Sequence, residues 1–242
     1  MKIKFAKFTS NGGRAVNEDF LLVSEKKSRA IAAVADGLGG HGMGDVASKL
    51  VCETAEACFD AQTDNAGLTE IIFQSCQEAL FARQKELKVN GKMRTTLNIL
   101  LADENSICWS HIGDSRTYYF KDKNLVKRTF DHSVPQMLAA AGQISESEIR
   151  FHEDRNRLLK VLGVEGQKPA FEIESPLKNE GNQQFLLCSD GFWELISEEQ
   201  ILLCLDEAEE PKLWLDNMVE LVTRNSKGRS TDNITAVAVW IY

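Results

Sequence analysis

The chain has 242 residues, of which 43% are hydrophobic, and a formal net charge of -8 at pH 7. This length is enough for one sizeable core, so we expect a single domain spanning residues 1–242. The acidic excess argues against a nucleic-acid-binding surface, which needs clustered Lys and Arg. No stretch approaches the roughly 20 apolar residues of a membrane span, and the six cysteines form no Cys-x-x-Cys pair. We therefore expect a reduced, cytoplasmic monomer that uses neither nucleic acid nor membrane.

The N-terminal third shows three strand patterns followed by two helical ones. Apolar residues alternate or run continuously in segments 3–8, 19–24 and 30–35, which predicts strands there. The glycine-rich run 36–44 that follows cannot be regular structure. Helical spacing of apolar residues then predicts helices over 45–59 and 68–88, with Thr69 or nearby polar residues available as caps.

The middle of the chain returns to short apolar runs separated by polar turns. These runs are 96–101, 107–112 and 116–120. We interpret the whole stretch 94–128 as an antiparallel meander. Residues 132–166 differ, because a short helix near 134–141 is followed by a polar, charged excursion from the core.

The C-terminal third mixes strands with a pair of helices. Strands are predicted at 171–174, 184–188 and 234–242, and helices at 197–205 and 211–226. Runs of strands interrupted by pairs of helices indicate α+β architecture instead of strict βαβ alternation. We expect a β-sandwich of two antiparallel sheets flanked by pairs of α-helices.

Acidic residues recur where predicted strands begin or stop. The positions are Asn17-Glu18-Asp19, Asp36-Gly37, Gly113-Asp114, Ser189-Asp190-Gly191 and Asp232-Asn233. A rigid sheet holds such carboxylates at its rim, where strands distant in sequence can converge on shared hard cations. Any single Asp-Gly or Asp-Asn pair is more often a turn, because Asp caps its own backbone and Gly supplies positive φ. The recurrence of these pairs therefore indicates a metal site more strongly than any one of them.

Taken in order, these motifs resemble the protein phosphatase 2C family, the metal-dependent protein phosphatases. The resemblance rests on Arg14-x-x-Asn17-Glu18-Asp19, Ala35-Asp36-Gly37-x-Gly-Gly, Ile112-Gly113-Asp114-Ser115-Arg116, Ser189-Asp190-Gly191 and Thr231-Asp232-Asn233. It spans nearly the whole chain. Asp131-His132-Ser133, Asn156-x-Leu158 and Leu162-Gly163 look like the bacterial branch, in which the segment 142–166 corresponds to a variable flap beside the catalytic cleft.

The resemblance implies two divalent cations, Mn²⁺ or Mg²⁺, with a third in bacterial members. A residue like Asp36 bridges two cations, and the carbonyl of a residue like Gly37 completes one of the two sites. Residues like Asp190 and Asp232 hold the other cation. A bridging water, acidified by the two cations, would then attack phosphorus in line with the departing serine or threonine oxygen.

For the remaining site residues, the sequence leaves more than one role open. Glu18 and Asp19 match acidic positions near the second cation, and the sequence leaves open which of them binds directly and which through water. Asp114 matches a ligand of the third cation, although a turn Asp bonded to its neighbours is the alternative. Arg14 matches the arginine that binds the substrate phosphate through its planar fork of donors, and an ordinary surface arginine is its alternative.

The histidines give no support to a general acid or a metal site. Eukaryotic relatives often carry His directly after the Asp-Gly pair, where Leu38 stands here, and we do not transfer that role to His41. We interpret His111, His132 and His152 as structural, because hard cations favour oxygen and these residues form no spaced cluster in the sequence.

The leading hypothesis is therefore hydrolysis of phosphoserine and phosphothreonine on proteins, opposing a bacterial serine/threonine kinase. One alternative is a phosphatase-like module that binds a phosphoprotein without turning it over. The intact Asp36, Asp190 and Asp232 argue against it. The other alternative is a switch phosphatase acting on one anti-anti-sigma-type partner.

Overall fold

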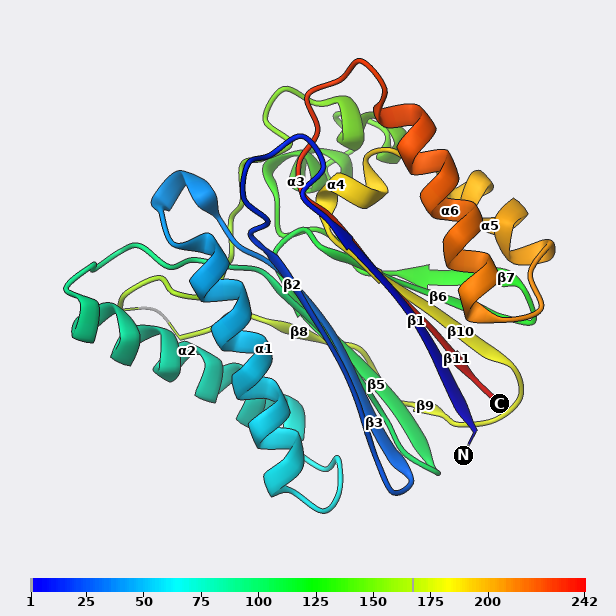
Figure 1. Cartoon of the computed structure of the whole chain (residues 1–242), viewed down its shortest axis with the longest axis horizontal. Helices are drawn as coiled ribbons and strands as arrows, with labels where there is room; N and C mark the ends of the chain where they lie inside the picture. Colours follow the sequence, from blue (N-terminus) through cyan, green and yellow to red (C-terminus); the bar gives the residue numbers. More distant parts are fainter. Residues whose placement is uncertain (1, 167) are drawn as a thin grey trace.

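The computed structural model describes residues 2–166 and 168–242, and in this part of the chain two antiparallel sheets pack face to face between layers of helices (Figure 1). The first sheet has the order β1 (Ile3–Ser10), β11 (Ile234–Ile241), β10 (Gln183–Cys188), β6 (Arg116–Lys121) and β7 (Asn124–Arg128). The second has the order β2 (Asp19–Lys26), β3 (Arg29–Asp36), β4 (Leu97–Ala102), β5 (Ser106–Ile112) and β8 (Glu172–Ile173), and β9 (Leu177–Lys178) also pairs with β5. The predicted α+β sandwich is confirmed.

Helices cover the outer face of each sheet. On the second sheet lie α1 (Gly44–Ala61) and α2 (Leu68–Leu87), and on the first lie the short α4 (Asp190–Trp193), α5 (Glu198–Asp206) and α6 (Pro211–Ser226) (Figure 1). The prediction for Thr69 is wrong. The residue before α2 is Gly67, which adopts a φ of 65°, so Thr69 lies inside the first turn.

The run of apolar residues in β3 serves two cores at once. Ile31 and Ala33 pack toward α1 and α2, whereas Ala32 and Val34 pack toward the other sheet. Successive side chains of a strand point to opposite faces, so a strand buried on both faces needs a continuous apolar sequence. Each large apolar side chain buried in this way contributes about 1.5–3 kcal/mol.

The interpretation of residues 94–128 as one meander is wrong. Strand β5 pairs with β4 in one sheet, whereas β6 pairs with β10 in the other, so the chain changes sheets between them. Gly113 makes this crossover with a φ of 109°, and a Cβ atom there would lie 2.4 Å from Cγ2 of Thr96. The crossover sets Asp114 at the rim between the two sheets.

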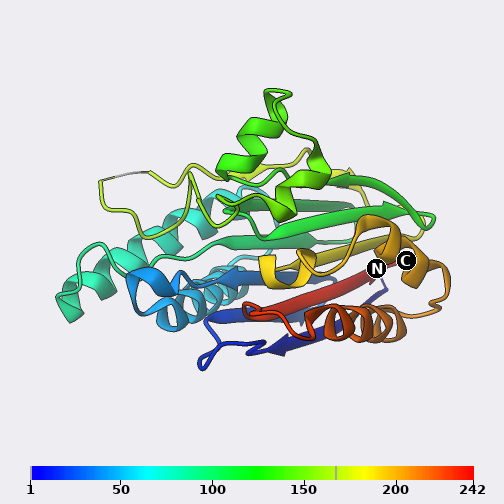
Figure 2. The ribbon, with the colours of Figure 1, turned by 90° about the horizontal axis from the view of Figure 1, so that it is seen from above.

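The polar excursion forms a separate lobe beside the sheets (Figure 2). It contains α3 (Val134–Ala140) and the 3₁₀ turn η2 (Glu146–Phe151). The chain then returns along the rim, where Leu158 bridges Ser133 and Leu162 bridges Thr95. The predicted strand 171–174 shrinks to β8, whose two residues are exposed. Among the helices described, none has the length and apolar character that crossing a membrane requires.

Candidate metal centre

A pocket of about 850 Å³ opens where the two sheets end. It is lined by all but one of the predicted site residues: Arg14, Glu18, Asp36, Gly37, Asp114, Asp190 and Asp232. These residues come from loops at the ends of five strands that are far apart in the sequence. The predicted convergence of strand-end carboxylates is therefore what the fold produces.

Asp19 is the predicted residue that does not line this pocket. It lies directly opposite Asp36 in the β2–β3 ladder and is 6% exposed. Its Oδ2 accepts a hydrogen bond from the hydroxyl of Ser189 at 2.7 Å. Asp19 therefore lies beside Asp36 on the same face of the sheet, but it is buried and does not line the open pocket.

The strand-end backbone holds Asp36 in place. Its N–H donates to Oγ1 of Thr96 at 2.9 Å, and its carbonyl accepts from Oγ1 of Thr95 at 2.8 Å. Asp36 is the last residue of β3, so its carboxylate is carried by a strand buried on both faces. Such a support keeps a ligand rigid.

Asp190 and Asp232 approach from the other sheet. Asp190 follows β10 and opens α4, and its buried Oδ1 has no hydrogen-bond partner among the described residues. Asp232 precedes β11, and its Oδ2 accepts from Nη2 of Arg14 at 2.7 Å. A buried carboxylate oxygen without a partner is costly unless a ligand satisfies it.

The glycine-rich loop makes room for Glu18. A Cβ atom at Gly39 would lie 1.9 Å from Oε2 of Glu18. The backbone of Glu18 is fixed as well, because its N–H donates to Oδ1 of Asn233 at 2.8 Å and its carbonyl accepts from Ser48 at 2.6 Å. This loop therefore cradles a carboxylate of the chain itself, which differs from a nucleotide-binding loop.

Burial and mutual repulsion dominate the electrostatics of this cluster. Burial raises the pKa of Asp19 to about 7 and that of Asp114 to about 8. Burial, followed by the charge of Asp19, raises the pKa of Asp36 well above its usual range, and burial with the charge of Asp114 does the same for Asp190. Carboxylates this close together cannot all ionise unless cations join them.

The residues present fit divalent cations. The donor set consists of carboxylate oxygens, the ligands that Mg²⁺ and Mn²⁺ prefer, and the unpartnered Oδ1 of Asp190 has the free lone pairs that a metal needs. Two or more cations would neutralise the charges that raise these pKa values.

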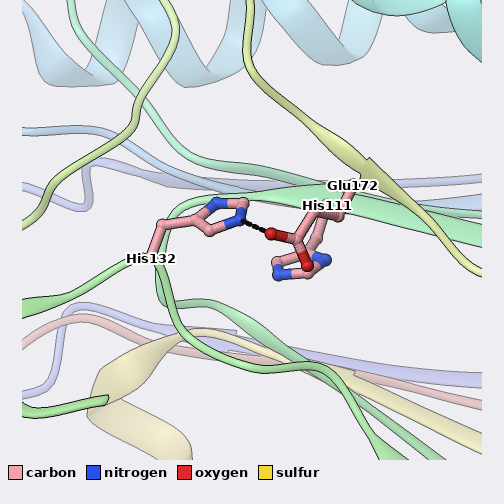
Figure 3. Close-up of side chains that lie close together, drawn as sticks. All are labelled: His111, His132 and Glu172. Carbon is pink, nitrogen blue, oxygen red and sulfur yellow. Dashed lines mark hydrogen bonds and ion pairs between the residues drawn. The ribbon is translucent and has the colours of Figure 1, made fainter. Parts of the chain in front are cut away.

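The structure brings together two histidines, His111 and His132, that show no cluster in the sequence. His111 and His132 stack with ring centroids 4.6 Å apart, and Nε2 of His132 donates to Oε1 of Glu172 at 2.9 Å (Figure 3). Nδ1 of His132 accepts from the N–H of Gly113 at 3.1 Å, so its proton must reside on Nε2. A metal at that nitrogen would have to displace this proton and leave an imidazolate. We therefore keep the structural interpretation and assign His132 the positioning of Gly113.

Some pocket residues had no signal in the sequence. Arg94 lines the pocket, and its carbonyl accepts from the N–H of Leu38 at 2.9 Å, but no local motif marks it. Arg157 lines the pocket from the returning stretch of the lobe. Leu38 also lines it, so the position that is His in eukaryotic relatives is apolar here. The side chain of His41 lies outside the described part of the chain.

Comparison with known proteins decides the family. The family model described as protein phosphatase 2C matches residues 11–227. The chain belongs to the protein phosphatase 2C family. This phosphatase is 31% identical over 245 residues to the serine/threonine phosphatase stp of Listeria monocytogenes, covering 97% of this chain and 94% of that protein. It is 31% identical over 227 residues to the serine/threonine protein phosphatase PstP of Mycobacterium tuberculosis, covering 93% of this chain and 42% of that one.

Solved structures of serine/threonine phosphatases have the same fold as this chain. The serine/threonine phosphatase Stp1 from Staphylococcus aureus superposes with a TM-score of 0.87 at 25% identity, covering all of this chain and 96% of that one. The catalytic domain of PstP in complex with two manganese ions superposes with a TM-score of 0.83 at 28% identity and 99% coverage of both. The predicted family, metal dependence and enzyme class, a serine/threonine phosphatase, are confirmed.

Proposed function

We propose that this phosphatase removes phosphate from phosphoserine and phosphothreonine of cytoplasmic proteins, acts as a monomer and opposes a serine/threonine kinase. The observation that carries the proposal is the convergence of Asp36, Asp190 and Asp232 with Arg14 in one pocket, where a buried oxygen of Asp190 lacks a partner. An anionic pocket of this kind needs cations before it can accept a phosphate.

The metal assignment follows the family resemblance, and the lining of the pocket supports it. Asp36, the carbonyl of Gly37, Asp190 and Asp232 would hold two cations, Mn²⁺ or Mg²⁺. When bound, such a pair acidifies water and neutralises charge on the phosphoryl group. Asp114 and Asp190 would hold a third cation, since after burial the charge of Asp114 is the largest cause of the raised pKa of Asp190.

Glu18 and Asp19 would play different roles. Glu18 lines the pocket, so it can reach a cation or one of its waters. Asp19 is buried beside Asp36 and accepts a hydrogen bond from Ser189, so we propose that it orients Asp36 and influences its ionisation. The position of Glu18 in the pocket lining supports Glu18, and not Asp19, as the residue that meets a cation or its water.

Arg14 would bind the substrate phosphate. Its side chain is 57% exposed, lines the pocket and already holds Oδ2 of Asp232, so it can reach a phosphate seated over the carboxylates. Its fork donates charge-assisted hydrogen bonds to phosphate oxygens. Leu38 has no proton to give, so solvent would protonate the departing alkoxide.

The proposal is tested by Mn²⁺-dependent phosphate release from a phosphothreonine peptide. Asp36→Asn and Asp190→Asn should each lower kcat/KM at least about 100-fold, because each removes a ligand charge. Asp216→Asn is the matched control, since Asp216 lies on α6 and pairs with Lys212 in solvent. A wild type that binds Mn²⁺ but releases no phosphate would overturn the proposal in favour of a binding module.

A further inference from the structure

A second pocket of about 400 Å³ adjoins the metal pocket. The two share Arg14, Asn156, Asp190 and Asp232 as lining residues. A peptide whose phosphate reaches the carboxylates therefore has a continuous path into this neighbouring space. We call it the flanking pocket.

The flanking pocket has one apolar wall. Phe151, at the end of η2, is 74% exposed, and Leu195, just after α4, lies in the same lining. An exposed aromatic side chain beside a catalytic pocket offers contact area to a bound chain at low entropic cost. Phe151 belongs to the segment 142–166, which we propose as a substrate-facing flap.

The charges in this pocket are mostly engaged. Nε of Arg155 pairs with Oε1 of Glu194 at 2.9 Å, and Nη2 of Arg150 pairs with Oε2 of Glu198 at 2.7 Å. Arg229 differs. It is exposed, and no ion pair or side-chain hydrogen bond of it occurs among residues 2–166 and 168–242. The other three arginines that line the flanking pocket each have an ion pair, whereas the charge of Arg229 has no partner among the described residues.

We propose that the flanking pocket binds a residue next to the phosphorylated serine or threonine, and that Arg229 selects an acidic side chain there. This inference rests on the proposed function and specifies its substrate class. Asp190 and Asp232 do not oppose the selection once cations neutralise them, and Glu194 is held by Arg155. Carboxylates and phosphates meet the guanidinium with paired hydrogen bonds, whereas Lys is repelled.

The test uses phosphothreonine peptides that differ at one position at a time on either side of the phosphorylated residue. Each position carries Ala, Glu, Lys or phosphoserine in turn, which separates a carboxylate preference from a second-phosphate preference. We measure kcat/KM with Mn²⁺ for the wild type, Arg229→Gln, Arg229→Glu and the control Arg83→Gln. Arg83 is an exposed arginine on α2, so its change removes the same charge far from the pocket.

At one position the wild type should prefer Glu over Lys by about fivefold, the upper range for an exposed ion pair. Arg229→Gln should bring this ratio close to one, because KM for the Glu peptide rises. Arg229→Glu should invert the ratio. Arg83→Gln should keep the wild-type ratio. Inversion also shows that the variant is folded, because it gains activity on the Lys peptide.

Equal kcat/KM for Glu and Lys peptides at every position in the wild type would overturn the inference, and so would a preference that survives in Arg229→Glu. Either result leaves the proposed function intact, because phosphate is still released. Absence of release from every peptide is a different result, and it would overturn the proposed function itself.

Discussion

Asp19 and Asp36 face each other directly across the β2–β3 ladder, two carboxylates on one face of a buried sheet. Like charges in directly opposed positions destabilise a sheet, and burial adds to the cost. The fold therefore stores electrostatic strain at the place where the proposed cations bind. Stability given up at a functional site in this way is common.

Asp19→Asn should relieve this repulsion in the metal-free protein. We expect its free energy of unfolding at pH 8 to rise by about 1–3 kcal/mol, because Asn carries no charge where Asp19 would ionise. Its affinity for Mn²⁺ should fall, which titration calorimetry measures. A variant that is less stable without metal and binds Mn²⁺ as tightly as the wild type would contradict the pairing argument.

The stability of the metal-free protein should fall as pH rises. The pKa of Asp19 is raised from 3.8 to about 7 and that of Asp114 to about 8, so in this interval the folded state binds more protons than the unfolded state. The slope of unfolding free energy against pH is then negative, and these two groups lower stability progressively from about pH 4 to about pH 8.

Chelator-treated protein, melted at several pH values, checks this slope. The double variant Asp19→Asn/Asp114→Asn is the control, because it lacks both groups and should show a flatter profile. Added Mn²⁺ should raise Tm more at pH 8 than at pH 5, since protons compete with the metal. A wild-type profile of stability against pH that runs parallel to that of the double variant would contradict the prediction.

A buried ion pair supports the crossover. Both Nε and Nη2 of Arg116 donate to the carboxylate of Asp131, at 2.8 and 2.7 Å, and the guanidinium lies 3.5 Å from the ring centroid of Trp193. Removing one partner leaves the other buried charge with only a longer ion pair, Arg116 with Glu198 at 3.6 Å or Asp131 with Arg128 at 3.8 Å. Asp131→Asn and Arg116→Met should therefore each cost about 3 kcal/mol.

Urea unfolding measures this cost. The double variant Arg116→Met/Asp131→Leu should lose less than the sum of the single changes, because no unpaired charge remains. Arg83→Met, which breaks an exposed pair on α2, should cost about 1 kcal/mol or less. Additive losses in the double variant would show that the two charges are not coupled.

His132 joins the histidine cluster to the crossover. It accepts from the N–H of Gly113 and donates its own N–H to the carbonyl of Gly113 at 2.8 Å, so it holds the residue before Asp114 from both sides. His132→Ala leaves the Gly113 N–H without a partner and should cost about 1–3 kcal/mol. The Mn²⁺ concentration needed for half-maximal activity should also rise, because Asp114 is less well placed.

His152→Ala is the matched control, since the His152 ring accepts from the N–H of Asp154 within its own turn, away from Gly113. Its Mn²⁺ dependence should match that of the wild type. Glu172→Gln, which keeps a hydrogen-bonding partner for His132, should have a smaller effect than His132→Ala. An unchanged Mn²⁺ dependence in His132→Ala would limit this histidine to a purely structural role.

The sequence predicted most elements because their patterns are local. The two-sided burial of β3 appears as a continuous apolar run, and the amphipathic α6 appears at helical spacing. The short α4 and β9 were missed, because four-residue and two-residue elements carry too little periodicity. Thr69 was misplaced because a glycine in the left-handed region can begin a helix without a side-chain cap.

The sequence alone predicted which residues line the pocket, since carboxylates at strand ends and Arg14 are visible in the order of the motifs. Tertiary structure decided how they are arranged. The register of β2 against β3 placed Asp19 opposite Asp36, the change of sheet at Gly113 brought Asp114 to the rim, and the packing of distant loops put Arg229 beside the pocket. Residue type and period are properties of a local stretch, whereas register and sheet order depend on contacts between segments far apart in the chain.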